Sequence, residues 1–408
     1  MKQYFEQISR YIDGQRASML ALWEELVNTE SGSRQIEGVN AVCGILRREM
    51  ERAGIHTRVL PMPDAGDMLI GEWNTGSPKA PLLLIGHMDT VFQEGAAREN
   101  PFHVDENGMA YGPGVLDMKA GLVIALYAVK ALAAVGWNER PVKFIFAGDE
   151  ENLHMFSNAK ELFAAEAKGA LAAFNFETGY MDDRFVVGRA GGGPARIDIR
   201  GVAAHSGIAP EKGRSAVLEA AYKIVEIESQ NDIARGRLMN CGVVSGGIGE
   251  NTIPDACSIR IGIRFPDAAV GAEIFDILNK AADRSTVPGT TAELDLSRVM
   301  QCMETTDGVM ALFKHLKQTA AACGYGEIGC FQVGGLSDSG IRALRLPAAC
   351  LPYAVWACAG QAAIPRRSTR RCGRCTADAC WQPAQRIRLG MILQSPDAFG
   401  ERQQKTST

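Results

Sequence analysis

Residues whose side chains could bind a metal follow a short apolar run in the first quarter of the chain. His87 and Asp89 come directly after the apolar residues 81–85, which predict a buried strand. Side chains two positions apart on a strand point to the same side of the chain. His87 can therefore bind a metal ion while Asp89 orients its ring.

Three later segments supply further carboxylates in the order that such a site needs. Asp117 follows a Gly-Pro-Gly sequence closely, and the pair Glu150 and Glu151 follows an apolar strand predicted at 142–148. Glu177 comes just after one more predicted strand. Because ligands gather past the ends of strands in open α/β sheets, these side chains are expected to meet.

This set of residue types is typical of a hydrolytic site with two zinc ions. Such a site uses histidine and carboxylate ligands, and one carboxylate usually bridges the ions. It also needs a carboxylate that is not a ligand and accepts a proton from the bridging water. We predict Glu150 as this general base and Asp89 as the residue that holds the ring. The predicted metal ligands are His87, Asp117, Glu151 and Glu177.

Each position also has an ordinary structural explanation. A lone buried histidine is more often a hydrogen-bonded core residue than a ligand. Asp117 could cap the apolar helix predicted after it, and the pair Glu150 and Glu151 could form a solvated turn. Glu177 could be an acidic residue at the surface. The order of the motifs along the chain favours the functional interpretation.

The predicted elements indicate an α/β fold with an insert. Up to residue 183, strands alternate with helices, which is typical of a sheet covered by helices. From residue 184 to 298 the pattern becomes that of a smaller α+β domain, which we expect to be ferredoxin-like. A helix is predicted again at 307–322. We therefore expect a zinc-binding domain formed by 1–183 and 299–408, with 184–298 inserted.

The composition excludes several classes of protein. A chain of 408 residues can form two domains. The net charge of −4 argues against a nucleic-acid surface. No apolar run is long enough to span a membrane, and the first residues lack the pattern of a signal peptide. We therefore expect a cytoplasmic protein.

Together, the motifs resemble the zinc exopeptidase and deacylase family. That family includes glutamate carboxypeptidase, acetylornithine deacetylase, succinyl-diaminopimelate desuccinylase and aminoacylase. The resemblance covers about residues 1–340, and the segment 209–213 is most similar to the glutamate carboxypeptidase branch. It implies hydrolysis of an amide bond next to a free carboxylate, in a small peptide or an N-acyl amino acid. Two zinc ions per subunit are expected, and other divalent ions such as cobalt could replace them.

The resemblance also implies roles for residues of the insert. His205, in an Ala-His-Ser-Gly sequence, is similar to the family's histidine that reaches into the partner subunit's site and stabilises the oxyanion. Asn251 and Arg264 resemble substrate-binding positions, where Arg264 would bind a substrate carboxylate through its planar guanidinium. A homodimer formed through the insert is therefore expected.

One family feature is missing from this chain. Relatives have a last metal ligand, a histidine, in a Gly-rich stretch near the C-terminus, but no histidine follows His315 here. We hypothesise that the chain is out of frame from a point between Ser339 and Tyr353. Shifted codons from residue 363 onward permit the sequence His-Thr-Pro-Ala-Glu-Tyr, which resembles the missing motif. The chain as written is therefore expected to fold poorly or to hydrolyse weakly.

Two alternatives to an active hydrolase remain open. The chain could be a pseudoenzyme or binding protein of the same fold, because the last metal histidine is missing. The C-terminal cysteines could instead form a zinc-binding tail, since Cys372 and Cys375 have the spacing of a zinc motif and Cys380 follows. The acyl group and side chain of the substrate stay undefined.

Overall fold

The structure is a computed structural model that describes residues 2–106, 108, 110–178, 184–341 and 348–350. The chain divides into two compact units. The first contains Met1–Val187 and Thr305–Phe331, together with the described residues after Arg342. The second contains Gly188–Glu304 and Gln332–Ile341. The expected cysteine motif and the missing histidine both fall outside the described residues.

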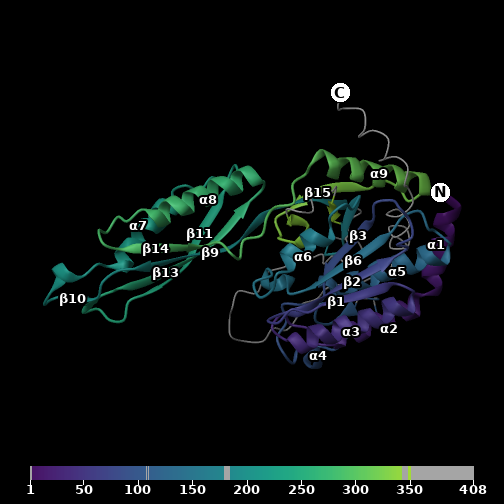
Figure 1. The fold of residues 1–408 in the computed structure, drawn as a ribbon, viewed down its shortest axis with the longest axis horizontal. Helices are drawn as coiled ribbons and strands as arrows, with labels where there is room; N and C mark the ends of the chain where they lie inside the picture. The colour runs from purple at the N-terminus through teal and green to yellow at the C-terminus, as the bar shows by residue number, and fades with distance from the viewer. Residues whose placement is uncertain (1, 107, 109, 179–183, 342–347, 351–408) are drawn as a thin grey trace. The chain divides into compact units, whose positions relative to one another are not determined.

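An eight-stranded sheet runs through the first unit (Figure 1). Its central strands are parallel, because β3 pairs with β6 on one side and with β7 on the other. Strand β2 pairs antiparallel with β6, and β1 with β2. In order across the sheet, the strands are β1 (His56–Leu60), β2 (Gly66–Trp73), β6 (Val142–Gly148), β3 (Leu82–His87), β7 (Ala172–Asn175), β16 (Ala348–Cys350), β8 (Arg184–Arg189) and β15 (Gly329–Val333).

Helices cover this sheet because their apolar faces need a partner. Helix α5 packs on β3 and is buried on nearly all sides, as its apolar sequence predicts. Helix α3 packs on β2 through one buried stripe. The first part of the chain forms two helices, because the helical backbone is interrupted at Gln15. The helices of the unit are α1 (Lys2–Gly14), α2 (Arg16–Asn28), α3 (Ile36–Arg52), α4 (Ala96–Glu99), α5 (Ala120–Ala134), α6 (Ala159–Glu166) and α9 (Asp307–Cys323).

The second unit is a four-stranded antiparallel sheet with helices α7 (Ala216–Glu228) and α8 (Ala268–Asp283) on one face (Figure 1). Every second residue of β13 points to the helices, so that Ile259, Ile261 and Ile263 are buried in the core. The elements follow the β-α-β-β-α-β order of ferredoxin-like folds. In order across the sheet, the strands are β11 (Leu238–Gly246), β13 (Ala256–Phe265), β9 (Gly191–Arg200) and β14 (Thr291–Asp295).

The predicted fold class, an α/β domain with a smaller α+β domain, is confirmed. None of the helices that the structure describes has the length and hydropathy needed to cross a membrane.

Candidate metal centre

The predicted ligands gather at the carboxyl ends of three neighbouring parallel strands. His87 is the last residue of β3 and pairs with Ala147 of β6, which places the following Glu150 next to it. Ile85 pairs with Asn175 of β7, so the segment that carries Glu177 also passes the end of β3. Side chains far apart in the sequence meet here because the strands are parallel and in register.

The ring of His87 is buried and faces two kinds of partner. Its Nε2 lies 3.3 Å from Oδ1 of Asp117 and 4.0 Å from Oε2 of Glu150. Its Nδ1 lies 3.0 Å from the backbone oxygen of Asp89 and 3.4 Å from the carboxylate of the same residue. A proton on Nδ1 can be donated to Asp89, which leaves the lone pair of Nε2 for a metal ion.

Two overlapping groups of potential ligands share this histidine. One group is His87, Glu150 and Glu177, and the other is His87, Asp117 and Glu151. Within each group the ligand atoms lie within 4.8 Å of one another. The four predicted ligands therefore lie at one site, and Glu150, which we predict as the general base, lies among them.

Asp89 connects the histidine to the turn that carries the two glutamates. Its carboxylate is fully buried and accepts hydrogen bonds from the backbone N–H groups of Glu150 and Glu151, each at 3.1 Å. It also accepts one from the hydroxyl of Ser33, at 2.6 Å. Burial would raise the pKa of Asp89, but the contacts with His87 and Ser33 and the N–H of Glu151 hold it below its ordinary value.

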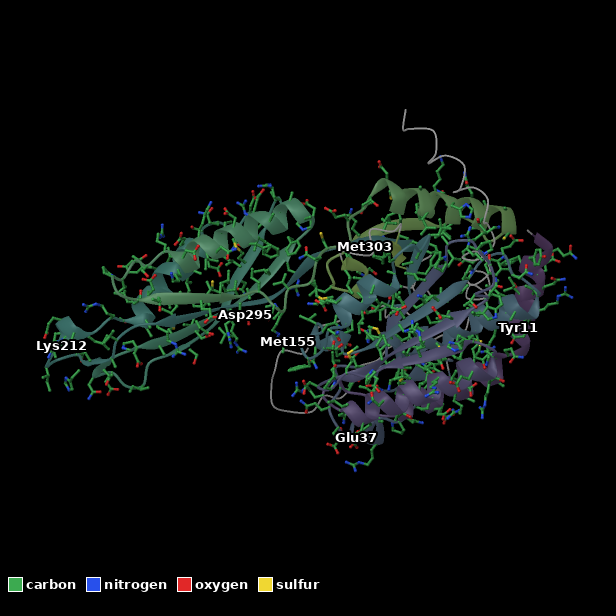
Figure 2. The ribbon with its side chains drawn as sticks, in the orientation of Figure 1. Tyr11, Glu37, Met155, Lys212, Asp295 and Met303 are labelled. Atoms are coloured by element: carbon green, nitrogen blue, oxygen red, sulfur yellow. The ribbon has the colours of Figure 1, made fainter. Side chains whose placement is uncertain are left out.

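The three predicted residues of the insert lie in the second unit. His205 is exposed on the short strand β10 (Ala204–His205), which pairs with β12 (Thr252–Ile253). The backbone oxygen of Asn251 accepts a hydrogen bond from Ser206 at 2.9 Å, so Asn251 lies beside the histidine. Arg264 lies elsewhere, on β13, on the face of the sheet away from α7 and α8. In Figure 2, Lys212 marks the part of the chain that follows His205.

The model of Peptidase family M20/M25/M40 matches residues 83–362. The chain belongs to this family. Carboxypeptidase G2 of Pseudomonas sp. (strain RS-16) is 27% identical over 81% of this chain and 80% of its own length. A succinyl-diaminopimelate desuccinylase of Acidiphilium cryptum is 27% identical over 69% of this chain and 76% of its own length. A dinuclear metal binding peptidase of this family from Bacillus subtilis has the same fold, with a TM-score of 0.56 and 15% identity over 93% of this chain and 97% of that one.

These relatives confirm the family and the enzyme class that the motifs predict, a metal-dependent amide hydrolase. The roles of the individual site residues stay predictions.

The charges at the site fit a divalent cation. Burial raises the pKa of Glu151 to about 8, and the negative charge of Asp117 adds to this effect while His87 opposes it. Burial would lower the pKa of His87, but its contacts with Asp117 and Asp89 raise it well above its ordinary value. A cation among these carboxylates would offset their repulsion. Imidazole and carboxylate ligands together suit zinc and cobalt.

Two further residues support this site, although the sequence predicts no role for either of them. Ser33 lies in a loop and reaches Asp89 across 56 positions of sequence. Lys119 is buried, and its Nζ donates to the backbone oxygen of Thr29 at 2.8 Å. Burial lowers the pKa of Lys119 to about 7, although Glu30 opposes this shift. Both residues join the loop before α3 to the segments that carry ligands.

Proposed function

We propose that this chain hydrolyses an amide bond next to a free carboxylate, in a small peptide or an N-acyl amino acid, with two zinc ions in each subunit. One observation carries the proposal: Nε2 of the buried His87 lies 3.3 Å from Asp117 and 4.0 Å from Glu150, within two overlapping ligand groups. The names of carboxypeptidase G2 and of the desuccinylase support a carboxylate-bearing substrate.

Four residues of the centre are proposed to bind zinc, and Glu150 is proposed to transfer a proton. The proposed ligands His87, Asp117, Glu151 and Glu177 would hold zinc, which when bound polarises the scissile carbonyl and makes a water molecule more acidic. Glu150 accepts the proton of the attacking water and passes it to the leaving amine. Its backbone N–H is held by Asp89, which keeps the carboxylate of Glu150 at the end of β6.

The second unit is proposed to bind substrate and to stabilise charge. His205 stabilises the oxyanion, while Asn251 and Arg264 bind the substrate. All three residues are exposed, so that each can reach a ligand. The planar guanidinium of Arg264 suits a carboxylate, because it can donate two parallel hydrogen bonds.

We further propose that residues 184–298 form a dimerisation domain inserted into the catalytic domain 1–183 and 299–408. Strand β11 lies at the edge of its sheet, and it exposes Val243 and Val244 to 43% and 48%. Helix α7 also exposes apolar residues, including Tyr222 at 48% and Val225 at 71%. An exposed sheet edge with apolar neighbours favours contact with another copy of the chain. The cytoplasmic location stays a prediction.

A binding protein without turnover is the second candidate. It is favoured by the absence of any histidine after His315, because the family's last metal ligand is expected there. A count of bound metal separates the two candidates. Two zinc ions per chain support the hydrolase, and one or none supports the binding protein.

Hydrolysis assays with the full chain and zinc test the proposed function. A panel of N-acyl amino acids and short peptides should include substrates that the chain cleaves, slowly because the family's last metal histidine is missing, and capping their free carboxylate should abolish cleavage. Glu150→Gln should lower kcat by roughly 10²–10⁴-fold, because the general base is lost while the size of the side chain is kept. An active Glu150→Gln variant would contradict the role of Glu150.

A further inference from the structure

The turn between β6 and α6 carries both Glu150 and Glu151 and has an unusual backbone. Asp149 begins the turn, and its backbone oxygen accepts hydrogen bonds from Asn152 at 3.2 Å and from His154 at 3.1 Å. Leu153 and His154 have φ values of 57° and 54°, in the left-handed region that residues other than glycine rarely adopt. Two such residues in succession need other contacts to keep the turn in this conformation.

The side chain of His154 supplies such contacts. It is only 4% exposed, and its Nδ1 lies 2.9 Å from Oδ1 of Asp149, which is 1% exposed. The hydroxyl of Ser157 donates to the same oxygen at 3.0 Å. The histidine ring also packs against Phe163 of α6, with the ring centroids 6.1 Å apart. Met155, labelled in Figure 2, follows it in the chain.

His154 and Asp89 hold different parts of the turn. Asp89 binds the backbone N–H groups of Glu150 and Glu151, whereas His154 binds the side chain of the residue before them. Asp149 is joined directly to Glu150, so the contacts that hold its buried carboxylate also restrain the backbone that leads into both glutamates. Displacements of about 1 Å are enough to impair a catalytic site.

A metal-binding role for His154 is not supported by its surroundings. Among the described residues, the groups of histidine, cysteine and acidic side chains that could hold an ion do not include His154. A purely structural role in the core is the remaining alternative, and it predicts a loss of stability without a change at the metal centre.

We infer that His154 is a positioning residue: through Asp149, it fixes the turn that presents Glu150 and Glu151 to the metal centre. The inference rests on the proposed function for its catalytic consequence, but the effect on the turn can be measured without metal or substrate. Outer partners of metal ligands commonly change metal affinity by about 10–100-fold when they are removed.

Three variants separate the side-chain hydrogen bond from the backbone conformation. His154→Gly removes the donor but accepts a positive φ without strain. His154→Asn keeps a nitrogen donor at the same number of bonds from the backbone as Nδ1, and asparagine tolerates this region. Leu153→Gly is the matched control, because it frees the adjacent left-handed residue and leaves the donor in place.

The first readout is amide hydrogen exchange of the segment 149–158 in the metal-free full chain. His154→Gly should exchange about 10–100-fold faster than the wild type, the factor expected for loss of a hydrogen bond to a charged group. His154→Asn should recover most of the protection, and Leu153→Gly should stay close to the wild type. Unchanged exchange in His154→Gly, or equal acceleration in His154→Asn, would overturn the inference.

The second readout is the absorption spectrum of bound cobalt, with zinc affinity measured by competition with a chelator. His154→Gly should change the cobalt spectrum and weaken zinc binding about 10–100-fold, and His154→Asn should restore both. A spectrum identical to the wild type would show a purely structural role and overturn the inference. If the turn loosens in His154→Gly but the wild type hydrolyses no substrate, the inference stands and the proposed function fails.

Discussion

Replacing Asp89 by asparagine tests how the metal centre is held together. Asn has one acceptor oxygen, so its amide nitrogen would face the N–H of Glu150, the N–H of Glu151 or the ring of His87. One charge-assisted hydrogen bond, worth roughly 1.5–3 kcal/mol, is lost and a buried donor is left unsatisfied. The expected cost is about 3 kcal/mol, or roughly 100-fold in the population of the competent site.

The assay is zinc affinity, measured by chelator competition, together with kcat on a substrate from the panel. Asp89→Asn should weaken zinc binding by about two orders of magnitude and lower kcat by at least tenfold. Asp64→Asn is the matched control, because Asp64 is an exposed aspartate of the same unit. Wild-type affinity in Asp89→Asn would refute the reasoning that Asp89 organises the ligands.

Three further predictions concern stability and assembly. Without metal, the free energy of unfolding should fall as pH rises from about 4.5 to 8, because the raised pKa of Glu151 means that the folded state binds this proton more tightly than the unfolded state does. Thermal melts across this pH range measure the dependence, and added zinc or the Glu151→Gln variant should reduce it. Lys223→Met should cost about 3–5 kcal/mol in denaturant melts, because it breaks a buried pair with Glu219, whereas Lys280→Met, in an exposed pair four residues apart, should cost under about 0.5 kcal/mol. Val225→Lys on α7 should give a monomer in light scattering if the second unit forms the dimer, and an unchanged mass would count against that interface.

The C-terminal hypothesis is tested at the level of the gene. Sequencing across the codons for residues 339–353 should reveal a frame error, and the corrected reading frame should encode the missing histidine. An unbroken, reproducible frame would remove this explanation for the absent ligand.

Much of the fold, and the meeting of the candidate ligands at one place, could be predicted because they depend on local patterns. The apolar run before His87 defines a buried parallel strand, and residues past such strands meet at one edge of the sheet. The supporting residues could not be predicted in this way. Ser33 contacts Asp89 only because two loops pair. The contact of His154 depends on a turn with positive φ at Leu153 and His154, and no glycine in the sequence indicates such a turn.

The break at Gln15 shows a second limit. The apolar period continues through 3–28, so the pattern predicts one helical stretch, while the backbone forms two helices. The Gly14 that ends the first helix is a weak signal, because glycine inside a helical pattern is also tolerated.

The number of zinc ions bound to the purified full chain tests the central claim most directly. We predict two zinc ions per chain and the loss of at least one of them in His87→Ala, because Nε2 of His87 has one lone pair and lies within both ligand groups. A wild-type chain that binds no zinc, or a His87→Ala variant that binds as much as the wild type, would contradict a metal centre at the ends of β3, β6 and β7.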